Sequence, residues 1–164
     1  MRKTLISLAA VMATCAAPAL AKDYILAPAR PDKLIVVDTE KMAVEKVITV
    51  KDAGPTPMVP VVAPGGKIAY ASVNKTESIV KLDLTTGETL ARVDLSTPEE
   101  RVKTLFGLAL SPDGKTLAAY QTPVRLLPTH FEVQPTRIAL YDADTLKLQK
   151  TFEAPRQVTL LAWS

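Results

Sequence analysis

The stretch Ile79-Val-Lys-Leu-Asp-Leu-Thr-Thr-Gly-Glu-Thr-Leu-Ala-Arg-Val-Asp-Leu95 contains an alternating run of apolar and polar residues, an Asp-led turn and a second run. The same pattern occurs at residues 34–50 (LIVVDTEKMAVEKVITV) and 138–154 (IALYDADTLKLQKTFEA). Alternation on both sides of a polar turn is typical of two antiparallel strands. The chain therefore repeats one β unit three times.

A second recurring piece lies between these copies, at residues 62–70 (VAPGGKIAY) and 110–118 (LSPDGKTLA). Its Pro, Gly and Asp residues favour a chain reversal between two apolar strands. Together the two pieces give four short strands per period of about 45 residues, which is typical of β-propeller blades. We therefore predict an all-β propeller with four-stranded blades.

The strand pattern divides the chain into successive blades. We assign residues 22–50 to a first blade that has only its second, third and fourth strands, 51–95 to a second blade, 96–153 to a third, and 158–163 to the first strand of a fourth. About four blades are the fewest that close a ring. Since this chain supplies about three, we expect it to be the N-terminal part of a longer propeller.

Residues 1–21 have the features of a secretory signal peptide. Arg2 and Lys3 precede an apolar run over residues 5–13, and small residues follow at Ala19 and Ala21. The apolar run is too short to cross a bilayer, so we expect cleavage, export and no membrane insertion. Cys15 leaves with this segment, and without it the chain has no cysteine for a disulfide, a c-type haem attachment motif or a nucleophile.

Charge and motif content exclude several classes of function. Removal of the signal segment leaves 18 basic residues (20 minus Arg2 and Lys3) against 17 acidic ones, with no basic run suited to nucleic acid. His130 is the only histidine, and one imidazole cannot form a three-ligand metal site. We therefore predict no catalytic, cofactor-binding or metal-binding residue in this chain.

Local motifs predict how several turns form. Asp38, Asp83 and Asp142 each begin a turn in which the carboxylate is expected to accept hydrogen bonds from nearby backbone amides. Gly87 is expected to supply a positive φ at a hairpin tip. The sequence Thr97-Pro-Glu-Glu100 resembles a helix start, with Thr97 as the N-cap and Glu100 closing a capping box.

One segment breaks the period. The interval from Asp83 to Asp142 is 14 residues longer than that from Asp38 to Asp83, and most of the surplus falls in the Pro-rich loop over residues 121–136. Antiparallel pairing places this loop at the same end of the sheets as residues 51–57 and 96–104. A loop that its prolines stiffen can dock a partner at limited entropic cost. The alternative is a loop that folds over its own blade. The candidate interface residues are Arg125, His130, Phe131, Glu132 and Gln134.

The blade pieces resemble the bacterial YVTN-type propeller repeat, through LSPDG at residues 110–114 and VVDT at 36–39. Four further segments resemble the β subunit of quinohaemoprotein amine dehydrogenase. They are DYILAPARPDK at 23–33, GPTPMVP at 54–60, DLSTPEERV at 94–102 and THFEVQPTR at 129–137. This second resemblance covers nearly all of the chain after the signal segment, including the unusual loop.

The resemblance implies a seven-bladed propeller in the periplasm, within a heterotrimer that oxidatively deaminates primary amines. In that family a small γ subunit holds cysteine tryptophylquinone, an α subunit holds two c-type haems, and the β propeller packs against γ and helps enclose the substrate pocket. The β subunit itself carries no redox centre. About three of the seven blades are present in this chain.

Two other functions are consistent with the residues. A stand-alone YVTN-type propeller would bind a peptide, a glycan or a surface polymer. An independent propeller enzyme, such as a lactonase or a metal-dependent oxidase, would need nearly all of its ligands from blades beyond this sequence. Adjacent genes for a dihaem protein and a small cysteine-rich protein would favour the amine dehydrogenase subunit.

Overall fold

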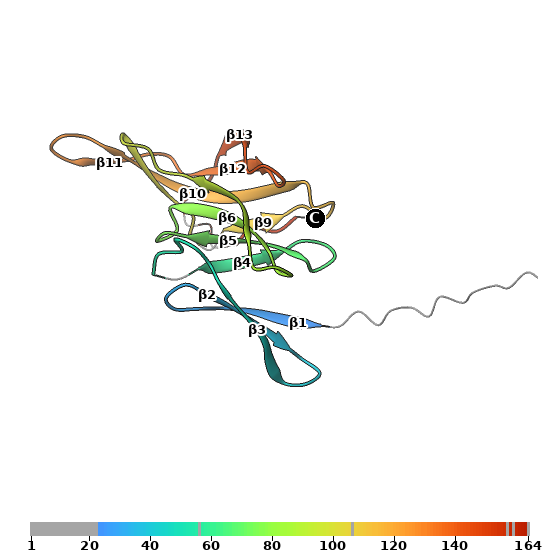
Figure 1. Ribbon diagram of the computed structural model, residues 1–164. Helices are drawn as coiled ribbons and strands as arrows, with labels where there is room; N and C mark the ends of the chain where they lie inside the picture. Colours follow the sequence, from blue (N-terminus) through green and yellow to red (C-terminus); the bar gives the residue numbers. More distant parts are fainter. Residues whose placement is uncertain (1–22, 56, 106, 157, 159, 164) are drawn as a thin grey trace, which may run out of the picture.

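The computed structural model describes residues 23–55, 57–105, 107–156, 158 and 160–163, and it contains strands and no helix within them. Three antiparallel sheets follow one another in chain order and lie side by side (Figure 1). This arrangement confirms the predicted all-β fold with small four-stranded units. The predicted signal segment lies outside the described residues.

The first sheet has three strands and the second has four, each pairing with its neighbour in the sequence. The first sheet contains β1 (Tyr24–Ala29), β2 (Lys33–Asp38) and β3 (Ala43–Thr49). The second contains β4 (Met58–Val62), β5 (Ile68–Val73), β6 (Ser78–Asp83) and β7 (Thr89–Asp94).

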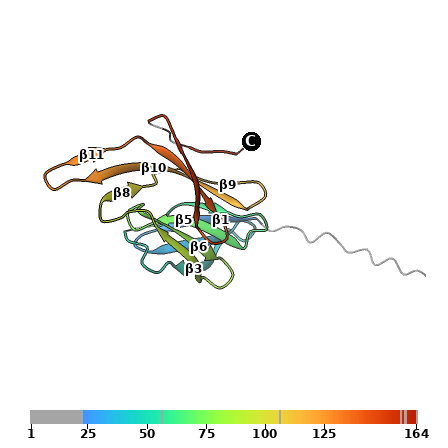
Figure 2. The same ribbon diagram turned by 90° about the horizontal axis from the view of Figure 1, so that it is seen from above.

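The third sheet is the most elaborate, because one of its strands extends beyond the blade. Its blade part contains β9 (Leu108–Leu110), the first half of β10 (Thr116–Leu126), β12 (Arg137–Asp142) and β13 (Leu148–Glu153). The second half of β10 pairs with β8 (Glu100–Lys103) on one side and with β11 (Phe131–Val133) on the other. This second half forms a ribbon that projects from the stacked sheets (Figures 1 and 2).

The repeated aspartates form the predicted turns. Asp38 Oδ1 accepts the amides two and three residues ahead at 2.9 and 3.0 Å, and Asp83 Oδ1 does the same at 2.6 and 3.1 Å. Asp142 Oδ1 accepts the corresponding amides at 3.2 and 2.8 Å. Gly87 has a φ of 86°, as predicted for the tip of its hairpin. These residues therefore have a structural role in every sheet.

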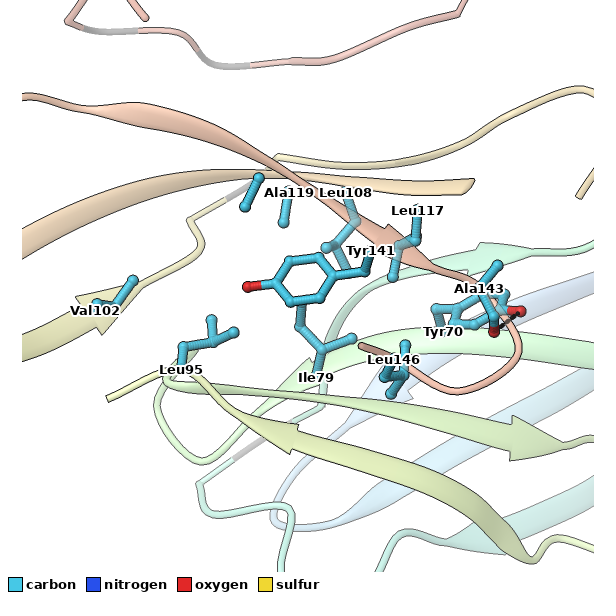
Figure 3. Close-up of a cluster of buried hydrophobic side chains, with 11 residues drawn as sticks. Tyr70, Ile79, Leu95, Val102, Leu108, Leu117, Ala119, Tyr141, Ala143 and Leu146 are labelled. Atoms are coloured by element: carbon cyan, nitrogen blue, oxygen red, sulfur yellow. Dashed lines mark hydrogen bonds between the residues drawn. The ribbon is translucent and has the colours of Figure 1, made fainter. Parts of the chain in front are cut away.

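Two apolar cores lie between adjacent sheets. The core between the first and second sheets is lined by Leu34, Ile48, Val50, Ala53, Ala71, Val73, Val80 and Leu82. The core between the second and third sheets includes Tyr70, Ile79, Leu108, Leu117, Tyr141 and Leu146 (Figure 3). Each sheet thus buries side chains against its neighbour, so the sheets stabilise one another by apolar burial.

Polar contacts also join the sheets. Lys46, on β3, donates to the backbone carbonyls of Leu84 and Thr85 in the second sheet. Lys81, on β6, forms an ion pair of 2.6 Å with Asp144 in the third sheet. Asp144 is largely exposed, so we expect this pair to contribute little to stability.

The predicted helix start at Thr97 is wrong. Thr97 Oγ1 does accept the amides of Glu99 and Glu100, at 3.3 and 3.1 Å, but the Thr97 amide donates to the Glu100 carbonyl and closes a tight turn. The chain then enters β8, because Arg101 and its neighbours pair with β10. The same hydroxyl pattern begins either a helix or a turn, and strand pairing decides between them here.

Two other expectations differ from the structure. Residues 121–136 were expected to form a loop, whereas β10 runs on to Leu126 and returns as β11, forming a hairpin. The predicted first strand of a fourth blade, over residues 158–163, has no strand among its described residues. A first strand is normally held by the second strand of its own blade, and the described part of the chain offers no such partner at this position.

Candidate protein-docking site

The projecting hairpin grows out of the third sheet without a break in strand β10. Pairing of Thr116 to Gln121 with β12 holds the first half of β10, and β8 and β11 flank the second half. At the tip, the Leu127 amide donates to the His130 carbonyl at 3.0 Å. Thr129 Oγ1 lies 3.1 Å from His130 Nδ1. The hairpin therefore extends a packed sheet and is held by its backbone ladder.

Neighbouring turns lie at the same end of the sheets as the hairpin, as predicted. The Thr104 amide donates to the Thr76 carbonyl at 2.9 Å, and the Asn74 amide donates to the Ala53 carbonyl. These bonds join residues 96–104 and 51–57 to the turn between β5 and β6. The segment 96–104 also contributes β8 to the hairpin itself.

The hairpin has two chemically different faces. Arg125 lies opposite Glu132, whereas Leu126 lies opposite Phe131 and Val124 opposite Val133. Residues directly opposite one another share a face of an antiparallel pair. One face is therefore charged and the other is apolar.

The apolar face is unusually exposed toward its tip. Phe131 is 73% exposed and Val133 is 66% exposed, although both are large apolar residues. Their cross-strand partners Val124 and Leu126 are partly buried. Exposed aromatic and aliphatic side chains that lie together on one rigid element are typical of protein-docking surfaces.

A cavity of about 350 Å³ continues this apolar face toward the root of the hairpin. It is lined by Leu105, Tyr120, Thr122, Val124, Val133, Gln134 and Arg156, among others. Its wall thus includes residues of both hairpin strands and of the segment that follows β13. The exposed face and the cavity form a continuous surface suited to an apolar side chain of a partner.

Polar contacts on the other face anchor the hairpin to the blade. Arg137 Nε donates to Gln121 Oε1 at 2.9 Å, and Arg137 also forms an ion pair of 3.0 Å with Glu100 on β8. Gln121 is buried and donates to the Tyr141 hydroxyl at 2.7 Å. Burial raises the pKa of Tyr141, while the Gln121 bond and the Arg137 charge oppose this rise. The network joins β8, β10 and β12 at the base of the hairpin.

The five predicted interface residues do not form one cluster. Arg125 and Glu132 form an exposed ion pair of 3.7 Å on the charged face, and Phe131 lies on the opposite face. His130 is in the tip, and Gln134 Nε2 donates to the Glu132 carbonyl at 3.3 Å while lining the cavity. Whether these residues contact a partner stays a prediction.

Sequence reasoning missed the apolar partners of Phe131. Val124, Leu126 and Val133 were passed over because the segment was interpreted as a loop, in which alternation has no meaning. The signal was present, since apolar residues occupy every second position on both sides of the turn. Recognising the hairpin would have identified its two faces.

The described residues contain no group of three or more His, Cys, Asp or Glu side chains placed to hold a metal ion. Nor does any described residue belong to a helix that is long and apolar enough to cross a bilayer.

No protein-family model matches the chain, and no curated protein matches it. Several solved structures resemble it in shape. The β-propeller domain of Cps50 (Swd1) from Myceliophteria thermophila superposes with a TM-score of 0.61 at 13% identity, over 86% of this chain and 44% of that one. Apo AztD from Citrobacter koseri gives a TM-score of 0.51 at 20% identity, over 81% of this chain and 32% of that one.

The fold is that of a β-propeller. A further structure, the dihydro-haem d1 dehydrogenase NirN in complex with DHE, gives a TM-score of 0.49 at 16% identity, over 76% of this chain and 24% of that one. The chain thus spans less than half the length of each of these structures. At these identities the likeness concerns the fold alone.

Proposed function

We propose that this chain is a non-catalytic propeller subunit that docks a partner protein through the hairpin β10–β11. The observation that carries the proposal is that Phe131 and Val133 lie on the same face of the hairpin and are exposed. The hairpin itself is held by the pairing of β11 with β10. Covering apolar surface gains about 25 cal/mol per Å² removed from water. Because the hairpin is already ordered, a partner would gain this energy at a small entropic cost.

We further propose that the partner is the quinone-bearing small subunit of a periplasmic amine dehydrogenase, following the resemblance described above. Two of the four resembling segments, 94–102 and 129–137, are far apart in the sequence but flank the same half of β10 as β8 and β11. The resemblance therefore includes the element that has the features of a docking surface. This agreement supports the assignment.

In this proposal the subunits divide the chemistry of oxidative deamination of primary amines. Cysteine tryptophylquinone belongs to the small γ subunit, and haem c belongs to the α subunit. This chain has one histidine and, after the signal segment, no cysteine. Its contribution is to hold the quinone-bearing subunit and to help enclose the pocket in which the amine reacts.

Affinity isolation from the periplasm, followed by mass spectrometry, tests the proposal. The chain should recover a dihaem protein and a small quinone-bearing protein. The double variant Phe131→Ser/Val133→Ser should recover at least tenfold less of both. Leu90→Ser is the matched control, because Leu90 is an exposed apolar residue on β7, away from the hairpin.

Two results would contradict the proposal. One is turnover of amines by the purified chain without any other subunit. The other is equal recovery of the same partners by the hairpin variant. Recovery of a peptide or glycan in place of the two redox proteins would instead favour a stand-alone binding propeller.

A further inference from the structure

The projecting hairpin and β8 form a three-stranded arm with two outer edges. Strand β10 lies in the middle, with β8 on one side and β11 on the other (Figure 2). The described part of the chain places no further strand beside either of them. A free edge presents backbone N–H and C=O groups that can pair with another chain, and natural proteins usually cover or protect it. The two edges of this arm differ in this respect.

The edge of β8 is closed by two hydroxyl residues. The Glu99 carbonyl accepts an amide of β10 at 2.8 Å, so alternation directs the backbone groups of Glu100 and Val102 away from β10. The Thr97 amide donates to the Glu100 carbonyl at 2.8 Å, and the Thr97 hydroxyl accepts the Glu100 amide at 3.1 Å. The Ser96 hydroxyl accepts the Val102 amide at 3.0 Å and donates to the Val102 carbonyl at 3.3 Å. All four outward groups therefore have partners.

The edge of β11 is open. The Gln134 amide donates to the Pro123 carbonyl of β10 at 3.1 Å. By the same alternation, the amides and carbonyls of Phe131 and Val133 point away from β10. Among the residues that the structure describes, none bonds these four groups. The side chains of the same two residues are the exposed apolar ones.

This open edge faces the rim of the propeller. Tyr120 and Leu126 of β10 direct their amides to the segment that precedes β10, whereas Pro123 directs its carbonyl to the segment that follows. β11 therefore lies on the same side of β10 as β12 and β13, which are the outer strands of the blade. Blades follow one another around the axis of a ring. Further blades would thus lie beside the faces of this sheet and not beside the edge of β11.

The outermost strand of the same blade has a protection that β11 lacks. On β13, the Lys150 ammonium lies 4.7 Å from the centre of the Phe152 ring. Charged side chains, and lysines above all, discourage pairing at an edge. The one charged residue of β11, Glu132, forms its ion pair with Arg125 across the hairpin. The apolar side chains of β11 stay exposed beside its open backbone groups.

We propose that the docked partner adds an extended strand to the free edge of β11. Its backbone pairs with the amides and carbonyls of Phe131 and Val133. In this mode of recognition, main-chain hydrogen bonds give affinity and alternate side chains give specificity. The inference rests on the proposed function and specifies how that partner is held.

The two faces of the hairpin define the sequence of the added strand. Its side chains beside Phe131 and Val133 lie on the apolar face, where apolar residues pair best. Its side chain beside Glu132 lies on the charged face, where a basic residue is favourable and an acidic one is destabilising. The segment that binds therefore carries a basic residue between two apolar ones.

Hydrogen exchange on the isolated chain and on the complex recovered from the periplasm tests the pairing. In the isolated chain the amides of Phe131 and Val133 should exchange fast, while the bonded amide of Gln134 exchanges slowly. In the complex, exchange at Phe131 and Val133 should slow at least tenfold. Unchanged exchange at both amides would overturn the inference and leave the docking proposal in place. Slow exchange already in the isolated chain would overturn it too, because the same polypeptide would then occupy the edge.

Two variants of Val133 separate the backbone from the side chain. Val133→Pro removes the outward N–H and keeps an apolar side chain of similar size, and proline is accepted at an edge whose N–H faces solvent. Val133→Ala keeps the N–H and removes two methyl groups. Recovery of the two redox proteins should fall at least tenfold with Val133→Pro and less than threefold with Val133→Ala. Slow exchange of the Gln134 amide checks that the hairpin persists in both.

The remaining outcomes separate this inference from the docking proposal. Similar recovery with Val133→Pro and Val133→Ala would overturn strand addition alone. If the unmodified chain recovers neither redox protein, the docking proposal fails and strand addition fails with it. Light scattering detects a second copy at the edge. A dimer of the isolated chain that Val133→Pro converts to a monomer would overturn the assignment of the edge to a partner.

Discussion

The hydroxyl group of Tyr70 donates a hydrogen bond of 2.8 Å to the backbone carbonyl of Ala143, across the junction between the second and third sheets (Figure 3). Both residues are buried. Burial raises the pKa of the Tyr70 hydroxyl, and the negative charges of Asp144 and Asp142 raise it further. The phenol therefore stays protonated and remains a donor at neutral pH and above.

Removal of this hydroxyl should weaken the junction. Tyr70→Phe leaves the buried Ala143 carbonyl without this donor, and we expect the free energy of unfolding to fall by about 1–3 kcal/mol. Urea unfolding monitored by circular dichroism measures the change. Tyr24→Phe is the control, because the Tyr24 hydroxyl bonds Glu45 at 3.3 Å in an exposed position and its loss should cost less. If both variants lost the same free energy of unfolding, the hydrogen bond at the junction would contribute no more than the exposed one.

Gly107 allows the chain to pass close to β10. A Cβ atom at this position would lie 2.5 Å from the Cβ of Tyr120, whose amide donates to the Gly107 carbonyl at 2.8 Å. Gly107→Ala should therefore destabilise the protein by about 1–3 kcal/mol, since the packed backbone must shift. The same change in a Tyr120→Gly background should cost less, because the clashing atom is then absent. An additive double variant would contradict this explanation.

Acid should weaken the turn at Asp142. Hydrogen bonds from the hydroxyl and then the amide of Thr145 hold the pKa of Asp142 below its ordinary value. The stabilising contribution is thus fully present above the unfolded pKa of about 3.9 and is lost as the pH falls through the lower folded value. Asp142→Asn keeps an acceptor but does not ionise, so its stability should fall less steeply between about pH 5 and pH 3.

Urea unfolding at three pH values measures this dependence. Asp142→Ala is the companion variant, and it should lose stability at every pH because it has no acceptor. Identical pH profiles for the unmodified chain and Asp142→Asn would show that this carboxylate does not contribute. Asp83, whose pKa is lowered by the amides of Thr86 and Thr85, should behave in the same way.

The network at the root of the hairpin should control its rigidity. Arg137→Met removes the bonds to Gln121 and Glu100, and we expect a loss of about 1–2 kcal/mol. Hydrogen exchange should accelerate in β8 and in the second half of β10, while β5 and β6 stay protected. Arg125→Met is the control, since its ion pair with Glu132 is exposed and contributes little. Uniform acceleration across the chain would indicate general destabilisation instead.

The sequence was sufficient to predict the repeating part of the fold, because the physical signals there are local. Alternation locates strands such as Lys33–Asp38 to the residue, and the turn aspartates accept hydrogen bonds from amides within three residues of themselves.

The structure of the hairpin could not be predicted in this way. Whether Thr97 begins a helix or a turn depends on the pairing of β8 with β10, about 25 residues away in the sequence. Local patterns do not contain that information.

The sequence identified the segment that forms the projecting hairpin, but it did not assign the side chains of this segment to faces. The break in the period identified residues 121–136, and residue type alone selected Arg125 and Phe131 as one group. Cross-strand register then separates them, because Arg125 faces Glu132 and Phe131 faces Leu126. Alternation along each strand separates its side chains into two faces, and the pairing shows which faces of the two strands coincide.

The two halves of strand β10 pair with different strands, the first with β9 and β12 and the second with β8 and β11, and this division restricts how the protein can change. A single residue inserted between Gln121 and Val124 would leave the strand pairing of the blade intact. It would turn over the outer half of the strand, so that the charged and the apolar side chains exchange faces. Two inserted residues would restore the original orientation and simply lengthen the arm. Viable length variation in this segment should therefore come in even steps.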